Sequence, residues 1–366
     1  MPRRDGAVPL DATNASDTVD VIDAPLLRDV GPQTAGPAVE VGLGARHICA
    51  RLGDSSVWCW GINEHGQLGD GTHDDHVTPR PVPGLVGVAQ LALGVRHTCV
   101  RLEDGRVACW GAVDWGQSGD GNPLDRVTPQ IVPGVDHVVE LVSTFDSLCA
   151  MRDDGRVLCW GADAYRQLGR PGNSEWCDAL TGSSFCGRHP AIVAGLPDDV
   201  VDLASSRVRV CASTRTGEVW CWGAMHPEDE TDPAVGRCPE RGLGSASPCS
   251  ATPRRLALSV VRSLATSGDW TCGLDANGAV TCNTNVFSVV GQQFDWLMDA
   301  DSTFAEVRAG ILTLHEASQP PVAVTVRPVT NVVQGSAFYG AMCVVDNGGA
   351  VWCGPHVDSV LTRVAF

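Results

Sequence analysis

Six close copies of one sixteen-residue segment recur along this chain, and each copy carries two cysteines ten positions apart. The copy that starts at Arg96 reads RHTCVRLEDGRVACWG. The cysteine pairs are Cys49 and Cys59, Cys99 and Cys109, Cys149 and Cys159, Cys211 and Cys221, Cys272 and Cys282, and Cys343 and Cys353. Such regular self-similarity constrains the fold more than length does, because it predicts an array of equivalent units.

The middle of each copy predicts a β-hairpin with a three-residue loop. The residue just past the midpoint is Gly105, Gly155, Gly217, Gly278 or Gly349 in five copies and Ser55 in the first. A type I turn followed by a residue at positive φ favours glycine at that place. With this loop Cys99 lies opposite Cys109 at a non-hydrogen-bonded position, where Cα atoms approach to about 4.5 Å. We therefore predict one disulfide in each hairpin. Buried free thiols and zinc are the alternatives, and two facing cysteines supply too few zinc ligands.

Six facing cysteine pairs favour an oxidising compartment, so we expect a periplasmic, secreted or surface-attached protein. Residues 1–38 are rich in aspartate and lack apolar periodicity, which is typical of a disordered acidic leader or stalk. No hydrophobic region follows Arg3 and Arg4, so we expect that the export signal is missing from this chain.

Charge and motif content exclude several functions. The formal net charge is −17, and all 26 basic residues are arginine. Such a surface repels phosphate backbones, so we expect no nucleic-acid partner. No apolar run approaches the length of a transmembrane helix, and no catalytic or phosphate-binding motif is present. We predict no cofactor and no metal, and we interpret the Asp- and His-containing loops at 65–76 and 114–120 as turns rather than cation sites.

The spacing of the copies indicates propeller blades. Their first cysteines are 50, 50, 62, 61 and 71 residues apart, and the intervals contain two more short strands around a Pro-Gly turn. The hairpins are apolar on both faces, as expected for sheets covered by neighbours. We predict an all-β propeller of four-stranded blades closed into a ring over residues 39–366, with a cysteine-free unit at 304–327. We expect seven blades, with six as the alternative, and we expect residues 360–366 to return beside the first blade.

Two insertions stand apart from the repeat, at residues 170–190 and 225–252. Their cysteines predict two local disulfides, Cys177 with Cys186 and Cys238 with Cys249, since the spacing does not fit a zinc ribbon. Ordered loops on a rigid scaffold often carry binding sites. The candidate binding residues are Trp176, Phe185, Arg188, Arg237 and Arg241. Decoration without a partner is the alternative.

At HTCVRLEDGRVACWG, followed by GQSGDG at 116–121, the chain resembles the repeats of the regulator of chromosome condensation family. The first copy has GQLGDG at 66–71, and the resemblance weakens after the third unit. The family implies a propeller, usually of seven blades. It includes nucleotide-exchange factors and exported bacterial proteins, and the cysteines and acidity here resemble the exported bacterial branch.

We therefore expect a monomeric, non-enzymatic binding propeller outside the cytoplasm that presents loops to a protein or glycan. The alternatives are an exchange factor for a GTPase and a hydrolase or lyase with a site in the central channel.

Overall fold

The structure is a computed structural model that describes most of residues 36–366. The residues outside this description are 1–35, 173, 180–181, 226–235, 239–247, 259–260, 268–269, 278–279, 284–287, 290–295, 301–302, 309–310, 317–322, 326–330, 339–340, 355–360 and 365. The expected leader at 1–38 thus lies almost wholly outside the described residues.

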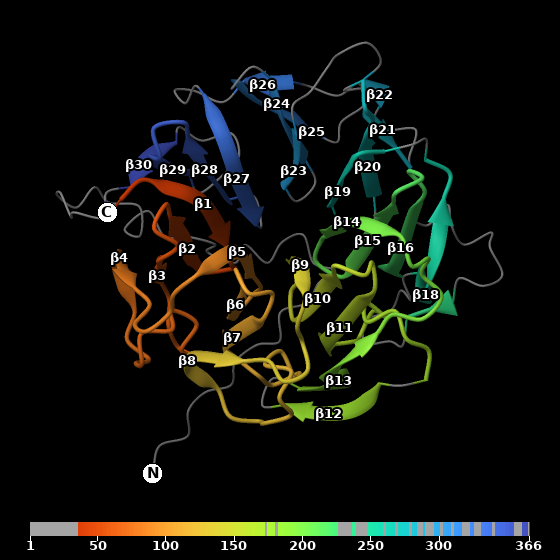
Figure 1. Cartoon of the computed structure of the whole chain (residues 1–366), viewed down its shortest axis with the longest axis horizontal. Coiled ribbons are helices and arrows are strands. Elements are labelled where there is room, and N and C mark those ends of the chain that lie inside the picture. Colours follow the sequence, from red (N-terminus) through yellow and green to blue (C-terminus); the bar gives the residue numbers. More distant parts are fainter. Residues whose placement is uncertain are drawn as a thin grey trace.

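The strands form antiparallel sheets arranged around a central axis (Figure 1). The first two sheets contain β1 (Ala38–Leu43), β2 (His47–Leu52), β3 (Val57–Gly61) and β4 (His76–Pro81), then β5 (Val88–Leu93), β6 (His97–Leu102), β7 (Val107–Gly111) and β8 (Arg126–Ile131). The third contains β9 (Val138–Ser143), β10 (Ser147–Arg152), β11 (Val157–Ala162), β12 (Glu175–Ala179) and β13 (Gly182–Ile192). The fourth contains β14 (Val200–Ser205), β15 (Arg209–Thr214), β16 (Val219–Ala224), β17 (Gly236–Arg237) and β18 (Pro248–Leu256).

The remaining sheets follow the same plan. They contain β19 (Ser263–Ser267), β20 (Trp270–Leu274), β21 (Val280–Cys282) and β22 (Ser288–Val289), then β23 (Trp296–Ala300), β24 (Thr303–Arg308), β25 (Ile311–Glu316) and β26 (Ala323–Thr325), and finally β27 (Val332–Phe338), β28 (Ala341–Asp346), β29 (Val351–Gly354) and β30 (Thr362–Val364). Among the described residues there are seven sheets, one for each of the six cysteine hairpins and one, β23 to β26, for the cysteine-free stretch. The described residues contain no helix, so the predicted all-β fold with four-stranded antiparallel blades is confirmed.

The innermost strands of the sheets contact one another in a closed circle. In chain order they are β1, β5, β9, β14, β19, β23 and β27, and β27 in turn contacts β1 (Figure 1). Two hydrogen bonds seal the junction of the chain ends: Val41 N–H donates to Gln334 Oε1 at 2.8 Å, and Leu43 N–H donates to Ser336 Oγ at 3.2 Å. The predicted closed ring is therefore present.

The cysteine hairpins have the predicted register. Cys99 lies opposite Cys109 with their Cα atoms 4.1 Å apart, and Val100 lies opposite Ala108. Gly105 has a φ of 80°, and Ser55 adopts the same left-handed conformation with a φ of 65°. The structure pairs the cysteines as predicted in all six hairpins and in both insertions.

In the early blades, a loop that contains glycine and glutamine forms a hydrogen bond with a tryptophan of the next blade. The indole N–H groups of three buried tryptophans donate to glutamine carbonyl oxygens one blade earlier, each at 2.9 Å: Trp110 to Gln67, Trp160 to Gln117 and Trp222 to Gln167. Gly119 has a φ of 66°, and a Cβ there would lie 2.7 Å from Val132 and 3.2 Å from the Trp160 ring. The GQxG and CWG motifs are therefore two halves of one contact between blades.

The first blade meets the last one differently. The Trp60 indole N–H has no hydrogen-bond partner among the described residues, and the ring of Phe366 packs edge-on against it at 5.8 Å. The expectation that the last strand returns beside the first blade is wrong, because β30 pairs with β29 and completes its own four-stranded sheet. Val364 and Phe366 nevertheless pack in one core cluster with residues of the first blade.

Candidate binding site

Both cysteine-stapled insertions are built by lengthening the outermost strand of a blade. The second half of β13 pairs with β11, while its first half extends past the blade and pairs with β12. β18 pairs in the same way with β16 and with β17. Both insertions follow the third strand of adjacent blades, so they begin on the same side of the ring.

The inner face of the β12–β13 hairpin is buried against the second blade. Cys177 and Cys186 are fully buried and pack in one cluster with Trp115, which belongs to the loop after β7. Arg188 lies on this face too, where its Nε is 3.7 Å from the Glu175 carboxylate. The disulfide and Trp115 therefore hold the hairpin in one position.

The outer face of the same hairpin carries two aromatic rings. Trp176 lies directly opposite Phe185 in the ladder, and their rings meet edge to face with centroids 5.2 Å apart. Trp176 is 61% exposed, the most exposed aromatic side chain among the described residues. Of the predicted binding residues, these two are brought together, and Arg188 lies on the opposite face.

Arg166 completes this surface and was missed by the sequence analysis. Its guanidinium lies 4.8 Å from the centroid of the Phe185 ring. Arg166 has a φ of 63°, at the place where the first two units have Gly66 and Gly116. A left-handed conformation costs a non-glycine residue about 1 kcal/mol or more, so an arginine here is a departure from the repeat. That substitution was the signal in the sequence.

A buried carboxylate lies close to the Arg166 guanidinium. Asp163 accepts hydrogen bonds from the Leu168 N–H at 3.0 Å and from the Ser174 hydroxyl, and Arg166 lies 3.9 Å away. Burial raises the pKa of Asp163 above its ordinary value despite these partners. The candidate binding surface is thus Trp176, Phe185 and Arg166, and we call it the aromatic surface.

The second insertion is only partly described. Arg237 lies in β17, whose partner residue across the ladder is Pro248. The Arg237 side chain and the whole of Arg241 lie outside the described residues. Their predicted binding role stays a prediction.

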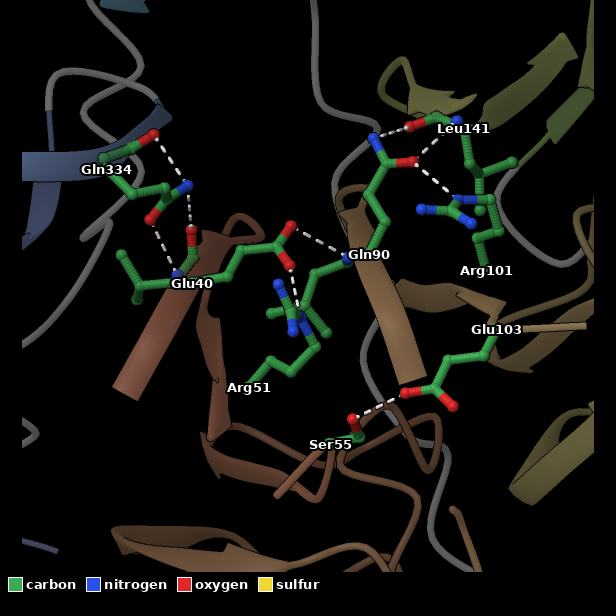
Figure 2. A network of polar contacts seen from close by, with 11 residues as sticks. Glu40, Arg51, Ser55, Gln90, Arg101, Glu103, Leu141 and Gln334 are labelled. Atoms are coloured by element: carbon green, nitrogen blue, oxygen red, sulfur yellow. Dashed lines mark hydrogen bonds and ion pairs between the residues drawn. The ribbon is translucent and has the colours of Figure 1, made fainter. Parts of the chain in front are cut away.

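A ring of polar side chains lines the central channel, in a cavity of about 520 Å³. Each of these side chains accepts a hydrogen bond from a backbone N–H of the next inner strand, and Figure 2 shows this contact for Glu40, Gln90 and Gln334. The pairs, at 2.8 to 3.0 Å, are Glu40 with Leu91, Gln90 with Leu141, Glu140 with Leu203, Asp202 with Leu264, and Gln334 with Val41. The channel carboxylates therefore join neighbouring blades, which gives them a structural role.

Burial shifts the titration of these channel acids. It raises the pKa of Glu140 to about 8, with a further contribution from the nearby charge of Asp202, and it raises the pKa of Asp202 to about 6. Two histidines that lie between blades have pKa values shifted in the opposite direction, below the ordinary value. Burial lowers the pKa values of His47 and His97 to about 3, so both are neutral near pH 7.

We predict that Glu140→Gln removes part of the pH dependence of stability. The pKa of Glu140 is higher in the folded protein than its ordinary value of 4.5, so its contribution to stability is present below pH 4.5 and is lost as the pH rises towards 8. Glutamine still accepts from the Leu203 N–H without carrying a charge, as Gln90 does for Leu141 one blade earlier. At pH 8 the variant should be more stable than the parent by on the order of 1 to 3 kcal/mol.

The measurement is the free energy of unfolding in urea at pH 5, 6.5 and 8. The matched control is Gln90→Glu, which should create the loss of stability at high pH that Glu140→Gln removes. Parallel pH profiles for the parent and Glu140→Gln would contradict the prediction.

The aspartate and histidine side chains of the glycine-rich loops already have partners. His76 Nε2 lies 2.7 Å from the Asp70 carboxylate, and His65 Nδ1 lies 2.8 Å from that of Asp125. Among the described residues, the group that could bring three metal-ligand atoms together consists of Glu175, Cys177 and Cys186. Those two cysteines form a disulfide and offer no thiolate.

The repeat motif identifies the family. Models of the regulator of chromosome condensation (RCC1) repeat match residues 54–101 in one case and residues 38–67 and 88–121 in another. The chain therefore carries RCC1 repeats within residues 38–121. RCC1-repeat propellers are mainly non-catalytic binding proteins or exchange factors, which is consistent with a protein that is not an enzyme.

Among curated proteins, the secretion-regulating guanine nucleotide exchange factor of Bos taurus is 42% identical over 69 residues, a segment that covers 17% of this chain and 15% of that protein. Among solved structures, human WBSCR16 is 18% identical, with a TM-score of 0.56 over 92% of this chain and 83% of that one. Yeast RCC1 (Prp20), solved bound to Kap60, is 20% identical, with a TM-score of 0.53 over 90% of this chain and 75% of that one. These structures show that the RCC1-like propeller fold is shared. None of the described residues forms a helix that could cross a membrane.

Proposed function

We propose that this RCC1-repeat propeller is a non-enzymatic binding protein that works outside the cytoplasm and captures a macromolecular partner through the aromatic surface. The observation that carries the proposal is Trp176, a large exposed side chain on a hairpin that is fixed by a disulfide and by Trp115. Tryptophan and arginine are enriched among the residues that dominate binding energy. A pre-ordered hairpin also loses less conformational entropy on binding than a free loop.

A protein is a better candidate partner than a glycan. The aromatic surface combines two rings with a guanidinium, the residue types that anchor protein interfaces. The disulfides fit a periplasmic, secreted or surface-attached protein of the exported bacterial type, and we propose that it acts as a monomer. An exchange factor for a cytosolic GTPase fits that compartment poorly.

The test starts with capture of a partner from the extracytoplasmic fraction of the native cell, followed by titration of the purified partner. We expect Trp176→Ala to weaken the affinity about 30-fold, the loss typical of a binding hot spot. Deletion of 172–188 should abolish binding. The control is Val86→Ala, since Val86 is 78% exposed but lies in a turn between blades. Equal affinity of the parent and Trp176→Ala would place the binding site elsewhere.

A further inference from the structure

Prolines interrupt the exposed strand edges of the early blades. The outermost strand of each of the first four blades contains at least one proline: Pro79 and Pro81 in β4, Pro129 in β8, Pro190 in β13 and Pro253 in β18. Proline has no N–H to donate, so proline in an edge strand discourages pairing with another chain. The repeat thus protects the outer edge of these blades.

The stapled hairpin creates a new edge without that protection. The strand order of the third sheet is β12, β13, β11, β10, β9, so β12 is the outer edge, and among the described strands none pairs with its other side. Its sequence, Glu-Trp-Cys-Asp-Ala, contains no proline. The insertion therefore adds an open edge over residues 175–179 beside the blunted edge that contains Pro190.

The hydrogen bonding of β13 shows which backbone groups of β12 face outward. The Phe185 carbonyl oxygen accepts a hydrogen bond from the Asp163 N–H at 2.8 Å, on the side of β13 that faces away from β12. The pair of Trp176 and Phe185 is therefore a non-hydrogen-bonded pair of the ladder. The N–H and C=O groups of Trp176, and by alternation those of Asp178, point to the open side of β12.

We propose that β12 is a docking edge to which a partner protein adds an extended segment as a further antiparallel or parallel strand. The proposal rests on the proposed binding function and gives its mode. Backbone bonds to Trp176 and Asp178 would supply affinity, and a side chain of the partner would pack on the aromatic surface. The sequence of β12 contains two acidic residues and no basic one, and the whole chain carries a net charge of −17, so the segment that fits alternates apolar with basic or neutral residues.

The test separates the contribution of the β12 backbone to binding from the contribution of its side chains. The probes are linear peptides of about twelve residues, selected from a random phage-displayed library on the whole parent protein and then titrated in solution. Asp178→Pro removes an outward N–H that the ladder does not use, whereas Asp178→Ala removes the carboxylate and keeps the N–H. We expect Asp178→Pro to weaken the selected peptides at least tenfold and Asp178→Ala to change their affinity less than threefold. Peptide binding should also slow amide exchange at Trp176 and Asp178.

Equal affinity of the two variants would overturn strand addition, as would a selection that yields no peptide dependent on the hairpin. Thermal unfolding of both variants checks that the fold is intact. If Asp178→Pro still captures the native partner while the deletion of 172–188 does not, the proposed function stands and strand addition is wrong. Dimerisation of the parent that Asp178→Pro abolishes would show that β12 serves a second copy of the chain, which also overturns the proposal.

Discussion

Reduction of the disulfides should unfold this propeller under conditions in which the oxidised protein is stable. Each hairpin disulfide closes a short loop and stabilises the fold by about 2 to 3 kcal/mol on the chain-entropy model. The structure has one in each of six hairpins. Their combined effect is as large as the net stability of roughly 5 to 15 kcal/mol that is typical of a folded domain. Loss of near-ultraviolet circular dichroism on reduction and alkylation is the measurement.

An insertion disulfide and a hairpin disulfide supply a matched comparison. Replacing Cys177 and Cys186 by alanine should lower the affinity for the partner more than it lowers the unfolding temperature, because this disulfide holds the hairpin and not a blade. Replacing Cys99 and Cys109, which lie between blades, should do the reverse. A reduced, alkylated protein that melts within a few degrees of the oxidised one would refute the prediction and remove the main physical argument for an oxidising compartment.

The hairpins could be predicted from the sequence because their geometry is local. A glycine at the third loop position determines the register, and the register places Cys99 opposite Cys109. The packing of blades against each other was harder to predict, since it joins residues about fifty positions apart. The motifs GQxG and CWG were visible in the sequence, yet only the structure shows that Gln67 accepts a hydrogen bond from Trp110 of the next blade.

The binding surface could be predicted only in part, because part of it depends on contacts that are not local in the sequence. Cysteine spacing and exposed residue types led to Trp176 and Phe185, which the structure brings together. The face to which Arg188 points depends on strand pairing inside an insertion that has no counterpart in the other units. The contact of Arg166 with Phe185 and the open edge of β12 became visible only in the structure. Both are departures from the repeat, so a position that breaks a repeat rule is a strong place to look for function.

Trp160→Ala should cause the largest loss of stability of any single change in the early blades, about 3 to 5 kcal/mol. Trp160 is fully buried, packs in the core between the second and third blades, and donates to the Gln117 carbonyl at 2.9 Å. Alanine leaves a cavity and removes the donor. The free energy of unfolding in guanidinium chloride measures the effect.

Phenylalanine substitutions divide this loss into packing and hydrogen bonding. Trp160→Phe keeps most of the ring but leaves the Gln117 carbonyl without its donor, so it should cost about 1 to 3 kcal/mol more than Trp60→Phe. Trp60 is the matched control because it is equally buried and its indole N–H has no partner among the described residues. If the two substitutions cost the same, the indole hydrogen bond contributes nothing measurable, and the blades are held together by packing of the rings alone.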